Sequence, residues 1–452
     1  MFSRILVANR GEIAVRVIRA VHELGCEAVA IYSTADEDAM HVRVADRSVR
    51  IGPPAAADSY LRIPNVIAAA VTTGCDAVHP GYGFLAENPA FVEACTDNDL
   101  VFVGPGAEAM RRVGDKAKAK GEMRAAGVPL VPGTEGTASL AEAAAAAREI
   151  GFPILLKAAA GGGGKGMRLV EDADELEDAY AAASAEAEAA FADGSLYVER
   201  AVVPTRHVEI QALCDLSGGV LTLGERECSI QRRHQKLIEE SPSCSLTAET
   251  RESMESAVER ACRQIGYANA GTFEFILGSD GEPYFIEINC RLQVEHPVSE
   301  LVTGIDIVRE QIRIAAGEPL AVTGRAPRSG HAIEIRINAE DPARGFAPAP
   351  GTVVRFRPPL GPGVRVDTAI RDGATIPPYY DSLIAKVIVH DSTRDGAIAR
   401  ALRALGELEV EGIPTTRDLA VDVLRSPGFA MGEYSTSYLA DMADRLPSLS
   451  AA

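Results

Sequence analysis

The sequence lacks an excess of positive charge. It has 452 residues, with 45 lysines and arginines against 64 aspartates and glutamates, so its formal net charge is −19 at pH 7. Proteins that bind nucleic acids over a broad surface need clustered Lys and Arg side chains to neutralise phosphates. The charge balance therefore argues against a nucleic-acid-binding protein of this kind, although a local basic cluster inside a site is compatible with it.

The cysteines lack the spacing that metal sites and disulfide frameworks require. The eight of them are scattered, with no C-x-x-C pair, at positions 26, 75, 95, 214, 228, 244, 262 and 290. Zinc sites and small secreted domains depend on patterned cysteines, so we expect reduced thiols and a cytoplasmic protein. The chain also lacks an apolar run of membrane-spanning length, and its first residues predict a strand instead of a signal peptide.

Among the features that are present, a glycine run is the most distinctive. Gly161–Gly164 lies between two apolar segments that predict strands, Pro153–Leu156 and Met167–Val170. Since glycines let backbone amides approach a ligand closely, such a loop can bind phosphates. The loop is neither a dinucleotide fingerprint, which opens a helix, nor a P-loop, because Lys165 is followed by Gly166 instead of Ser or Thr. A hairpin loop without a ligand is the alternative, and a phosphate site would need metal ligands from elsewhere.

Alanine-rich segments on either side of the glycine run predict helices. The first begins at a capping box formed by Ser139 and Glu142, and the second runs from about Asp172 to Gly194. A further strand is predicted at Leu196–Arg200. The order helix, strand, glycine loop, strand, helix, strand predicts a small α+β lid whose helices cover one face of a short sheet.

The N-terminal part alternates between strand and helix patterns. Arg4–Ala8 and Cys26–Ser33 predict strands, and Glu12–Leu24 between them predicts an amphipathic helix. This alternation predicts a parallel sheet with helices on both faces, whose ligands lie beyond the carboxyl ends of the strands. The candidate residues at these ends are Asn9, His79, Tyr82 and Phe84. For Asn9 and Phe84, ordinary turn chemistry is an equally good interpretation.

Two glutamates lie within otherwise apolar strands of a predicted hairpin. Pairing of Gly271–Leu277 with Pro283–Asn289 around a glycine-containing turn places Glu274 and Glu287 on one face of neighbouring strands, with Asn289 on the face of Glu287. Buried carboxylates are costly unless a cation compensates them, and Mg²⁺ prefers oxygen ligands. We therefore favour a magnesium site over two salt-bridged glutamates.

Two further segments indicate an anion site. The segment Glu227–Lys236 carries three cations and a histidine in an acidic protein, with a solvated basic turn as the alternative. Arg291, Gln293 and Glu295 occupy alternate positions and are expected on one side of an extended segment. An arginine can bind a planar oxyanion through two hydrogen bonds, and the nearby Glu295 could be a general base. An ion pair between Arg291 and Glu295 is the alternative.

The C-terminal part predicts a mixed α/β domain after a linker at about 324–330. Strands are predicted at 332–338, 351–356 and 382–390, and helices at 394–408 and 416–424. Arg336 lies in the first of these strands, where a salt-bridged arginine is the simplest interpretation. We expect three domains, at residues 1–113, 114–324 (with the lid at about 130–203) and 325–447.

Together these motifs resemble those of biotin carboxylase, the ATP-grasp component of biotin-dependent acyl-CoA and pyruvate carboxylases. The similarity covers nearly the whole chain and includes, besides the glycine run, Ile5–Ala14, His79–Asn88, Gly114–Lys116, Arg232–Lys236, Asn289–Pro297 and Tyr379–Ser382. It implies an ATP-grasp fold of α/β and α+β class, with an N-terminal Rossmann-like domain, a lid subdomain and a C-terminal mixed α/β domain. It also implies MgATP-dependent carboxylation of biotin by bicarbonate through carboxyphosphate, the first half-reaction of an enzyme such as acetyl-CoA carboxylase.

The resemblance implies roles for the matching positions. The positions expected to bind ATP are Lys116, Lys157, Gly162, Gly163, Gly164, Glu199, Val202, His207, Gln231 and His234. Those expected to hold Mg²⁺, or Mn²⁺ in its place, are Glu274, Glu287 and Asn289. Those expected to bind bicarbonate are Lys236, Arg291, Gln293 and Val294. Glu295 is the expected base, Tyr82 and Arg336 are expected at biotin, and the expected catalytic set is Glu295, Arg291, Lys236 and Arg336.

The resemblance also implies partners. Biotin would arrive on a carrier protein or domain, because the chain has no Met-Lys-Met biotinylation motif, and a carboxyltransferase would use the product. A homodimer is expected through the N-terminal helix, where Arg19 and Glu23 match interface positions, although a surface pair one turn apart is an equally good interpretation. No nucleic acid or membrane partner is expected, and the final acyl acceptor cannot be named from this chain.

Departures and alternatives complete the prediction. Ala160 replaces a usual glycine, Arg200 a common lysine and Cys290 a usual threonine. Another ATP-grasp ligase that acts through a different acyl phosphate is the main alternative. A non-catalytic subunit that only binds nucleotide is a further one, and the intact charged residues at the expected catalytic positions argue against it.

Overall fold

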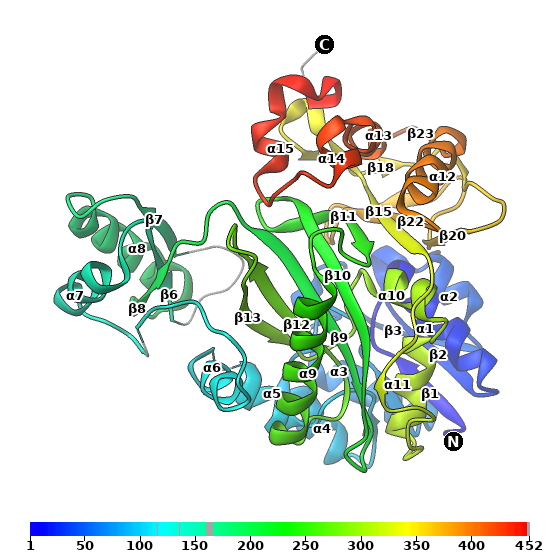
Figure 1. Cartoon of the computed structure of the whole chain (residues 1–452). Coiled ribbons are helices and arrows are strands. Elements are labelled where there is room, and N and C mark those ends of the chain that lie inside the picture. Colours follow the sequence, from blue (N-terminus) through cyan, green and yellow to red (C-terminus); the bar gives the residue numbers. More distant parts are fainter. Residues whose placement is uncertain (115, 135, 160–165, 450–452) are drawn as a thin grey trace.

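The computed structural model describes residues 1–114, 116–134, 136–159 and 166–449, without the side chains of Lys116 and Ala117. Figure 1 shows the N-terminal sheet and its helices in blue and cyan, and a small lid that projects to the left. Long green strands lead from the middle of the molecule to the C-terminal part in yellow to red.

Five parallel strands form the N-terminal sheet in the order β3-β2-β1-β4-β5. Their bounds are β1 Arg4–Val7, β2 Glu27–Ser33, β3 Arg47–Gly52, β4 Ala77–His79 and β5 Val101–Phe102. The apolar face of α1 (Gly11–Glu23) buries Ile13, Val17 and Ile18 against this sheet. The parallel sheet predicted from the βαβ pattern is confirmed, and the strand order reverses between β1 and β4, which places a crevice at their carboxyl ends.

The loops at these carboxyl ends are held by local contacts. The Nδ2 of Asn9 donates hydrogen bonds to the carbonyl oxygens of Pro80 and Tyr82, both at 2.7 Å. The ring of Phe84 stacks on Tyr60 with 5.0 Å between centroids. Turn contacts and packing hold Asn9 and Phe84, and both residues also line the cleft at these strand ends. The shorter helices of this region are α2 Met40–Val44, α3 Ile63–Thr73, α4 Pro89–Thr96, α5 Ala107–Gly114 and α6 Lys116–Ala125.

The lid is a small antiparallel sheet covered by two helices. Its strands β6 (Ile154–Ala158), β7 (Met167–Val170) and β8 (Leu196–Arg200) lie in the order β7-β6-β8. The helices α7 (Leu140–Ile150) and α8 (Leu176–Phe191) bury small alanine side chains against Ile154, Leu156 and Val198. This confirms the predicted order of elements on both sides of the glycine run.

The ends of the lid helices follow their capping residues. The predicted capping box is present, because the amide of Ser139 donates to Oε2 of Glu142 at 2.8 Å and the amide of Glu142 donates to Oγ of Ser139 at 3.4 Å. The helix α8 begins later than predicted, because Oδ1 of Asp172 accepts hydrogen bonds from the amides of Asp174 and Glu175 and forms a turn ahead of the helix.

Nine strands form the central sheet, which crosses the boundary between the predicted second and third domains. The order is β13-β12-β9-β10-β11-β15-β22-β20, and β14 pairs with β10. The bounds are β9 Arg206–Cys214, β10 Val220–Arg232, β11 Gln235–Ser241, β12 Asn269–Leu277, β13 Pro283–Asn289, β14 Gly324–Arg325, β15 His331–Asn338, β20 Val364–Thr368 and β22 Leu383–Asp391. Part of the predicted linker is thus a strand, because β10 takes up its backbone hydrogen bonds.

Helices cover this sheet and complete the C-terminal part. They are α9 Ala248–Ile265, α10 His296–Thr303, α11 Ile307–Ala315, α12 Arg394–Glu407, α13 Arg417–Arg425, α14 Pro427–Met431 and α15 Tyr438–Asp441. The strand predicted at 351–356 is wrong as one element: β18 (Gly351–Thr352) and β19 (Arg355–Arg357) pair with different partners. The amides of Val353 and Val354, between them, donate to Ala374 and Glu411 on these two partner segments. Of the helices described, none is long and apolar enough to cross a membrane.

Candidate active site

Side chains from every part of the chain line one cleft with a volume of about 1170 Å³. The predicted site residues that line it are Tyr82, Lys157, Glu199, Val202, His207, Gln231, His234, Lys236, Glu274, Glu287, Asn289, Arg291, Gln293, Val294, Glu295 and Arg336. The side chain of Lys116 and the residues Ala160, Gly162, Gly163 and Gly164 lie outside the described part of the structure. These residues therefore share one cleft, whereas the candidate His79 is fully buried and does not line it.

The predicted pair of metal-binding glutamates lies across two strands. Glu274 of β12 lies directly opposite Glu287 of β13, so the two glutamates share one face of neighbouring strands, as predicted. The Nδ2 of Asn289 donates to Oε1 of Glu274 at 2.9 Å. Mg²⁺ prefers carboxylate and amide oxygens, and a buried carboxylate such as that of Glu274 needs a compensating cation. The oxygen donors of this group fit a magnesium ion.

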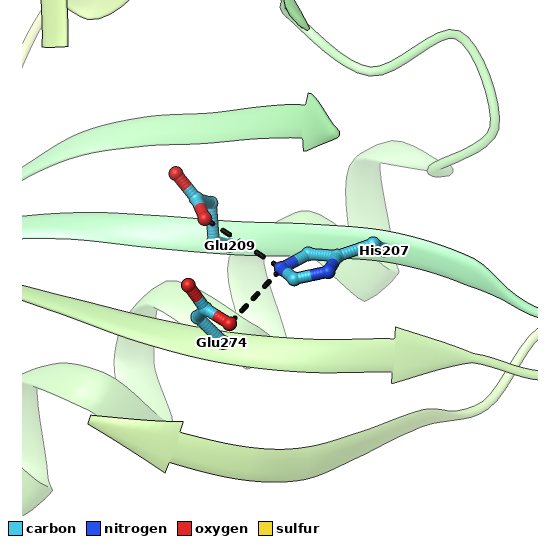
Figure 2. A group of neighbouring side chains, drawn as sticks. All are labelled: His207, Glu209 and Glu274. Carbon is cyan, nitrogen blue, oxygen red and sulfur yellow. Dashed lines mark ion pairs between the residues drawn. The ribbon is translucent and has the colours of Figure 1, made fainter. Parts of the chain in front are cut away.

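Glu209 of β9 joins this group (Figure 2). Its Oε2 lies 3.6 Å from Nε2 of His207, and that nitrogen lies 3.2 Å from Oε2 of Glu274. One ligand atom from each of these three residues lies within 4.8 Å of the others. Burial lowers the pKa of His207, but Glu274 and Glu209 outweigh burial and raise it to about 9. Protonated His207 therefore forms ion pairs with both Glu209 and Glu274.

Lys236 of β11 is surrounded by three carboxylates. Its Nζ donates to Oε2 of Glu209 at 2.6 Å, to Oε1 of Glu274 at 3.0 Å and to Oε1 of Glu295 at 2.6 Å. Burial lowers the pKa of Lys236, but these three carboxylates raise it well above its usual value. The lysine is therefore a fixed positive charge at the centre of the site.

Glu295 is fully buried at the start of α10. Besides Lys236, it accepts a hydrogen bond from Nη2 of Arg336 at 2.9 Å. Burial would raise the pKa of Glu295, but Lys236 and Arg336 outweigh it and hold the pKa below its usual value. Glu295 is thus ionised at neutral pH and can accept a proton.

Arg291 does not form the alternative ion pair with Glu295. Its Nε donates to Oε2 of Glu87 at 2.9 Å, and its Nη1 donates to Oε1 of Gln293 at 2.9 Å. The prediction of one extended segment from Arg291 to Glu295 is wrong, because the backbone turns at Val294 and Glu295 as α10 begins. The three side chains nevertheless line the same cleft.

Arg336 of β15 is salt-bridged, as the simplest interpretation expected, and it also lies in the cleft. Its Nε donates to Oε1 of Glu239 on β11 at 2.6 Å. Tyr82 enters the cleft from the N-terminal part, and its hydroxyl donates to Oε1 of Glu12. Tyr82 and Arg336, which are far apart in the sequence, therefore line the same cleft.

Glu199 on β8 of the lid pairs with two lysines. The Nζ of Lys157 lies 2.6 Å from its Oε2, and the Nζ of Lys120 contacts its Oε1. The Nζ of Lys120 also lies 4.2 Å from the centre of the Tyr197 ring. Lys120 was not predicted as a site residue, because no sequence motif marks it. It reaches the site through its contacts with Glu199 and Tyr197 on the lid strand β8.

The basic segment is the end of a β-hairpin. Arg232 pairs with Gln235 across a two-residue turn, in which Arg233 and His234 have positive φ values of 47° and 66°. The strand β10 thus extends to Arg232, and Gln231 lies opposite Lys236 inside the cleft. Arg233 is exposed. The tip of this hairpin is therefore solvated, while the strand residues Gln231 and Lys236 next to the tip face the cleft.

Two of the sequence departures have clear surroundings. The Nη2 of Arg200 donates to the hydroxyl of Tyr284 at 2.7 Å. Cys290 is buried, and its amide donates to Oε1 of Glu87 at 2.9 Å. The Arg200 side chain is thus held by a hydrogen bond, and the small Cys290 side chain packs in the interior.

Three charged residues beside the site were missed from the sequence. Glu209 and Arg226 are fully buried, and the Nε of Arg226 donates a hydrogen bond to Oε1 of Glu209 at 2.5 Å. The third residue, Glu239, contacts Arg336. A usable signal was the alternation of polar residues at 207, 209 and 211 within an apolar strand, which puts them on one face. Glu239 offers no such signal. It is followed by Glu240 near the end of β11, so polar and apolar residues do not alternate there.

Three protein-family models match the chain. They are described as biotin carboxylase, N-terminal domain, over residues 1–110, carbamoyl-phosphate synthase L chain, ATP binding domain, over 115–323, and biotin carboxylase C-terminal domain, over 334–441. A biotin carboxylase of Nostoc sp. is 51% identical over 443 residues, which cover 98% of this chain and 99% of the relative.

Solved structures of similar proteins match the fold over nearly the whole chain. A biotin carboxylase of Campylobacter jejuni in complex with β-γ-ATP has a TM-score of 0.94 at 47% identity, over 98% of this chain and 99% of the other. The biotin carboxylase domain of a 2-oxoglutarate carboxylase from Hydrogenobacter thermophilus, a dimer in complex with MgADP, ADP and bicarbonate, has a TM-score of 0.93 at 48% identity, over 98% of both chains.

Proposed function

The chain belongs to the biotin carboxylase family and carboxylates biotin with ATP, Mg²⁺ and bicarbonate, and we propose which residues carry out each step. One observation carries the proposal: Lys236 and Arg336 both contact Glu295, next to the paired glutamates Glu274 and Glu287. A base, an anion-binding lysine and a metal-binding pair are thus neighbours in one cleft.

ATP binds between the lid and the central sheet in this proposal. Lys116 and Lys157 contact phosphates, the glycine loop covers them, and Glu199 and Val202 lie at the adenine. His207, Gln231 and His234 line the nucleotide. Glu274, Glu287 and Asn289 hold Mg²⁺, which when bound supplies positive charge that offsets the charge of the phosphates.

Bicarbonate binds to Lys236, Arg291, Gln293 and the amide of Val294. Glu295 takes its proton while a bicarbonate oxygen attacks the γ-phosphorus, so that ADP leaves and carboxyphosphate forms. Carboxyphosphate then divides into CO₂ and phosphate. The closed lid excludes water, which would otherwise hydrolyse this intermediate.

Biotin binds beside Tyr82 and Arg336. Phosphate removes the N1′ proton, Arg336 offsets the negative charge of the resulting enolate, and N1′ attacks CO₂ to give carboxybiotin. Because Arg336 already contacts Glu295 at 2.9 Å, both chemical steps take place around one carboxylate.

The rate of ADP release tests this function. We expect release to require bicarbonate and to rise when free biotin is added. Another ATP-grasp ligase would respond to a different carboxylate, and a subunit that only binds nucleotide would release no ADP. Release that ignores both bicarbonate and biotin would sink the proposal.

The partners follow from the family. We propose a homodimer, as in the Hydrogenobacter thermophilus domain, and a biotin carrier and a carboxyltransferase that chooses the acyl acceptor. Glu23 of the predicted interface pairs with Arg309 of α11 at 3.6 Å within the chain, while Arg19 is exposed. The domain bounds 1–113, 114–324 and 325–447 and a cytoplasmic location stay predictions.

A further inference from the structure

The side chain of Arg336 is held by two buried carboxylates. Its Nε donates to Oε1 of Glu239 at 2.6 Å, and its Nη2 donates to Oε2 of Glu295 at 2.9 Å. Glu295 is assigned above to take the proton of bicarbonate, which removes its negative charge. Glu239 transfers no proton in the proposed mechanism. Its contact with Arg336 can therefore persist through both the bicarbonate step and the biotin step.

Glu239 has an unusual neighbour in the sheet. It lies directly opposite Glu334 on β15, and both side chains are fully buried. Side chains in such a pair lie about 5 Å apart at Cβ. Among the described residues, neither oxygen of Glu334 has a hydrogen-bond partner, and neither has Oε2 of Glu239. Two ionised carboxylates in this position would repel strongly, so the pair retains a proton.

The groups that face the pair decide where the proton resides. Glu239 faces Arg336, Glu295, Lys236 of its own strand and Cys228 of β10, besides Glu334. Glu334 faces Lys386 of β22, Arg336, Glu295 and Tyr82, besides Glu239. Only Glu239 has a direct hydrogen bond to a cation.

The pKa values follow these contacts. Burial raises the pKa of Glu239 to about 7 against the opposing effect of Arg336. Burial raises the pKa of Glu334 well above its usual value despite Lys386. The proton therefore resides on Glu334, and Glu239 is the ionised member above about pH 7.

We propose that Glu239 is a positioning residue that holds Arg336 for the biotin step, and that a proton kept on Glu334 allows Glu239 to stay charged beside it. This inference rests on the proposed role of Arg336 at the biotin enolate. When Glu295 becomes protonated, its contact with Arg336 weakens, and Glu239 keeps the guanidinium in place until N1′ attacks CO₂. A charged Glu334 would compete for Arg336 from the same face of the sheet.

Two rates of the full chain separate this role from general stability. One is bicarbonate-dependent ADP release without biotin, and the other is turnover with free biotin. We expect Glu239→Gln to lower kcat/KM for biotin about tenfold, because an ion pair becomes a hydrogen bond between the Arg336 cation and a neutral amide. The first rate should change less than about twofold. Glu334→Gln mimics the neutral carboxyl and should keep both rates within about twofold.

The pH profile gives a second readout. In the unmodified protein, kcat/KM for biotin should fall as the pH decreases through about 7, because Glu239 gains a proton. This decrease should be absent in Glu239→Gln. A profile that is the same in both proteins contradicts the assignment.

Arg336→Lys distinguishes the inference from the function on which it rests. Full biotin turnover in Arg336→Lys would refute the role of Arg336 itself. A loss in Arg336→Lys with normal turnover in Glu239→Gln would overturn only the positioning role. Equal losses of both rates in Glu239→Gln would show that Glu239 has a merely structural role. A loss of biotin turnover in Glu334→Gln as large as that in Glu239→Gln would show that Glu334 is charged.

Discussion

At the scale of single residues, the site depends on a balance between burial and charge at Glu295. Burial makes a carboxylate more basic, while Lys236 and Arg336 make it less so, and the cations prevail. In the proposed mechanism, bicarbonate bound to Lys236 would compete with Glu295 for the same ammonium group. Glu295 would then gain basicity as the substrate arrives, which would couple binding to proton transfer.

Replacing Glu295 with glutamine should remove the base and keep the shape. We expect biotin carboxylation to fall by about a hundredfold or more, the usual contribution of general base catalysis. ATP affinity should change little, because Glu295 contacts Lys236 and Arg336 instead of the lid. Steady-state turnover and nucleotide titration measure the two quantities, and near-normal turnover would refute the role.

Arg226 should be important for stability. It is fully buried and bonded to Glu209, Gln211, Ser299 and Thr272. Arg226→Met leaves Glu209 short of a cation, so we expect a loss of about 3 kcal/mol in the free energy of unfolding. Arg111→Met is the matched control, since its pair with Glu93 is exposed and worth less than about 1 kcal/mol. Urea denaturation that gives equal losses would contradict this.

His41 should make stability depend on pH. The ring is fully buried, and burial lowers its pKa from 6.5 to about 4. Between these values the unfolded chain binds a proton that the folded chain does not, so the free energy of unfolding falls as the pH decreases, by about 3 kcal/mol in total. Urea denaturation at several pH values should show a shallower decrease in His41→Gln. The half-exposed His22→Gln serves as the control, and identical slopes in His41→Gln and the unmodified protein would contradict the assignment.

At the scale of elements, local patterns predicted much of the structure. The capping box at Ser139, the hairpin that pairs Glu274 with Glu287 and the strand that carries Arg336 all follow from turn, capping and period-two signals. The errors arose where a side chain redirects the backbone, as at Asp172 before α8, or where a following helix begins, as at Glu295. Such redirection depends on individual hydrogen bonds that a hydrophobic pattern does not contain.

The capping box should control the end of the lid. Ser139→Ala removes the hydroxyl that accepts from the amide of Glu142, which should cost α7 about 1 kcal/mol. Amide hydrogen exchange in the first turn of α7 should become faster, while exchange in the central sheet should not change. Ser253→Ala, within α9 and exposed, is the control, and unchanged exchange in α7 of Ser139→Ala would contradict the prediction.

At the scale of the whole molecule, the site is built from segments far apart in the sequence. The strands β11 and β15 pair across the predicted boundary at 324, so Arg336 reaches Glu239 and Glu295. Arg291 reaches Glu87 of the N-terminal part in the same way. The family motifs identified most of these residues, but no local pattern could predict which charges meet, because the pairing arises only when the parts close around the cleft.

The fate of a bicarbonate oxygen tests the central claim most directly. If a bicarbonate oxygen attacks the γ-phosphorus, that oxygen stays on phosphorus when CO₂ leaves. With ¹⁸O-labelled bicarbonate, ATP and free biotin, we therefore predict one ¹⁸O atom in the released phosphate of each turnover, measured by mass spectrometry. Phosphate that carries no label while carboxybiotin forms would contradict carboxyphosphate and the role given to Glu295.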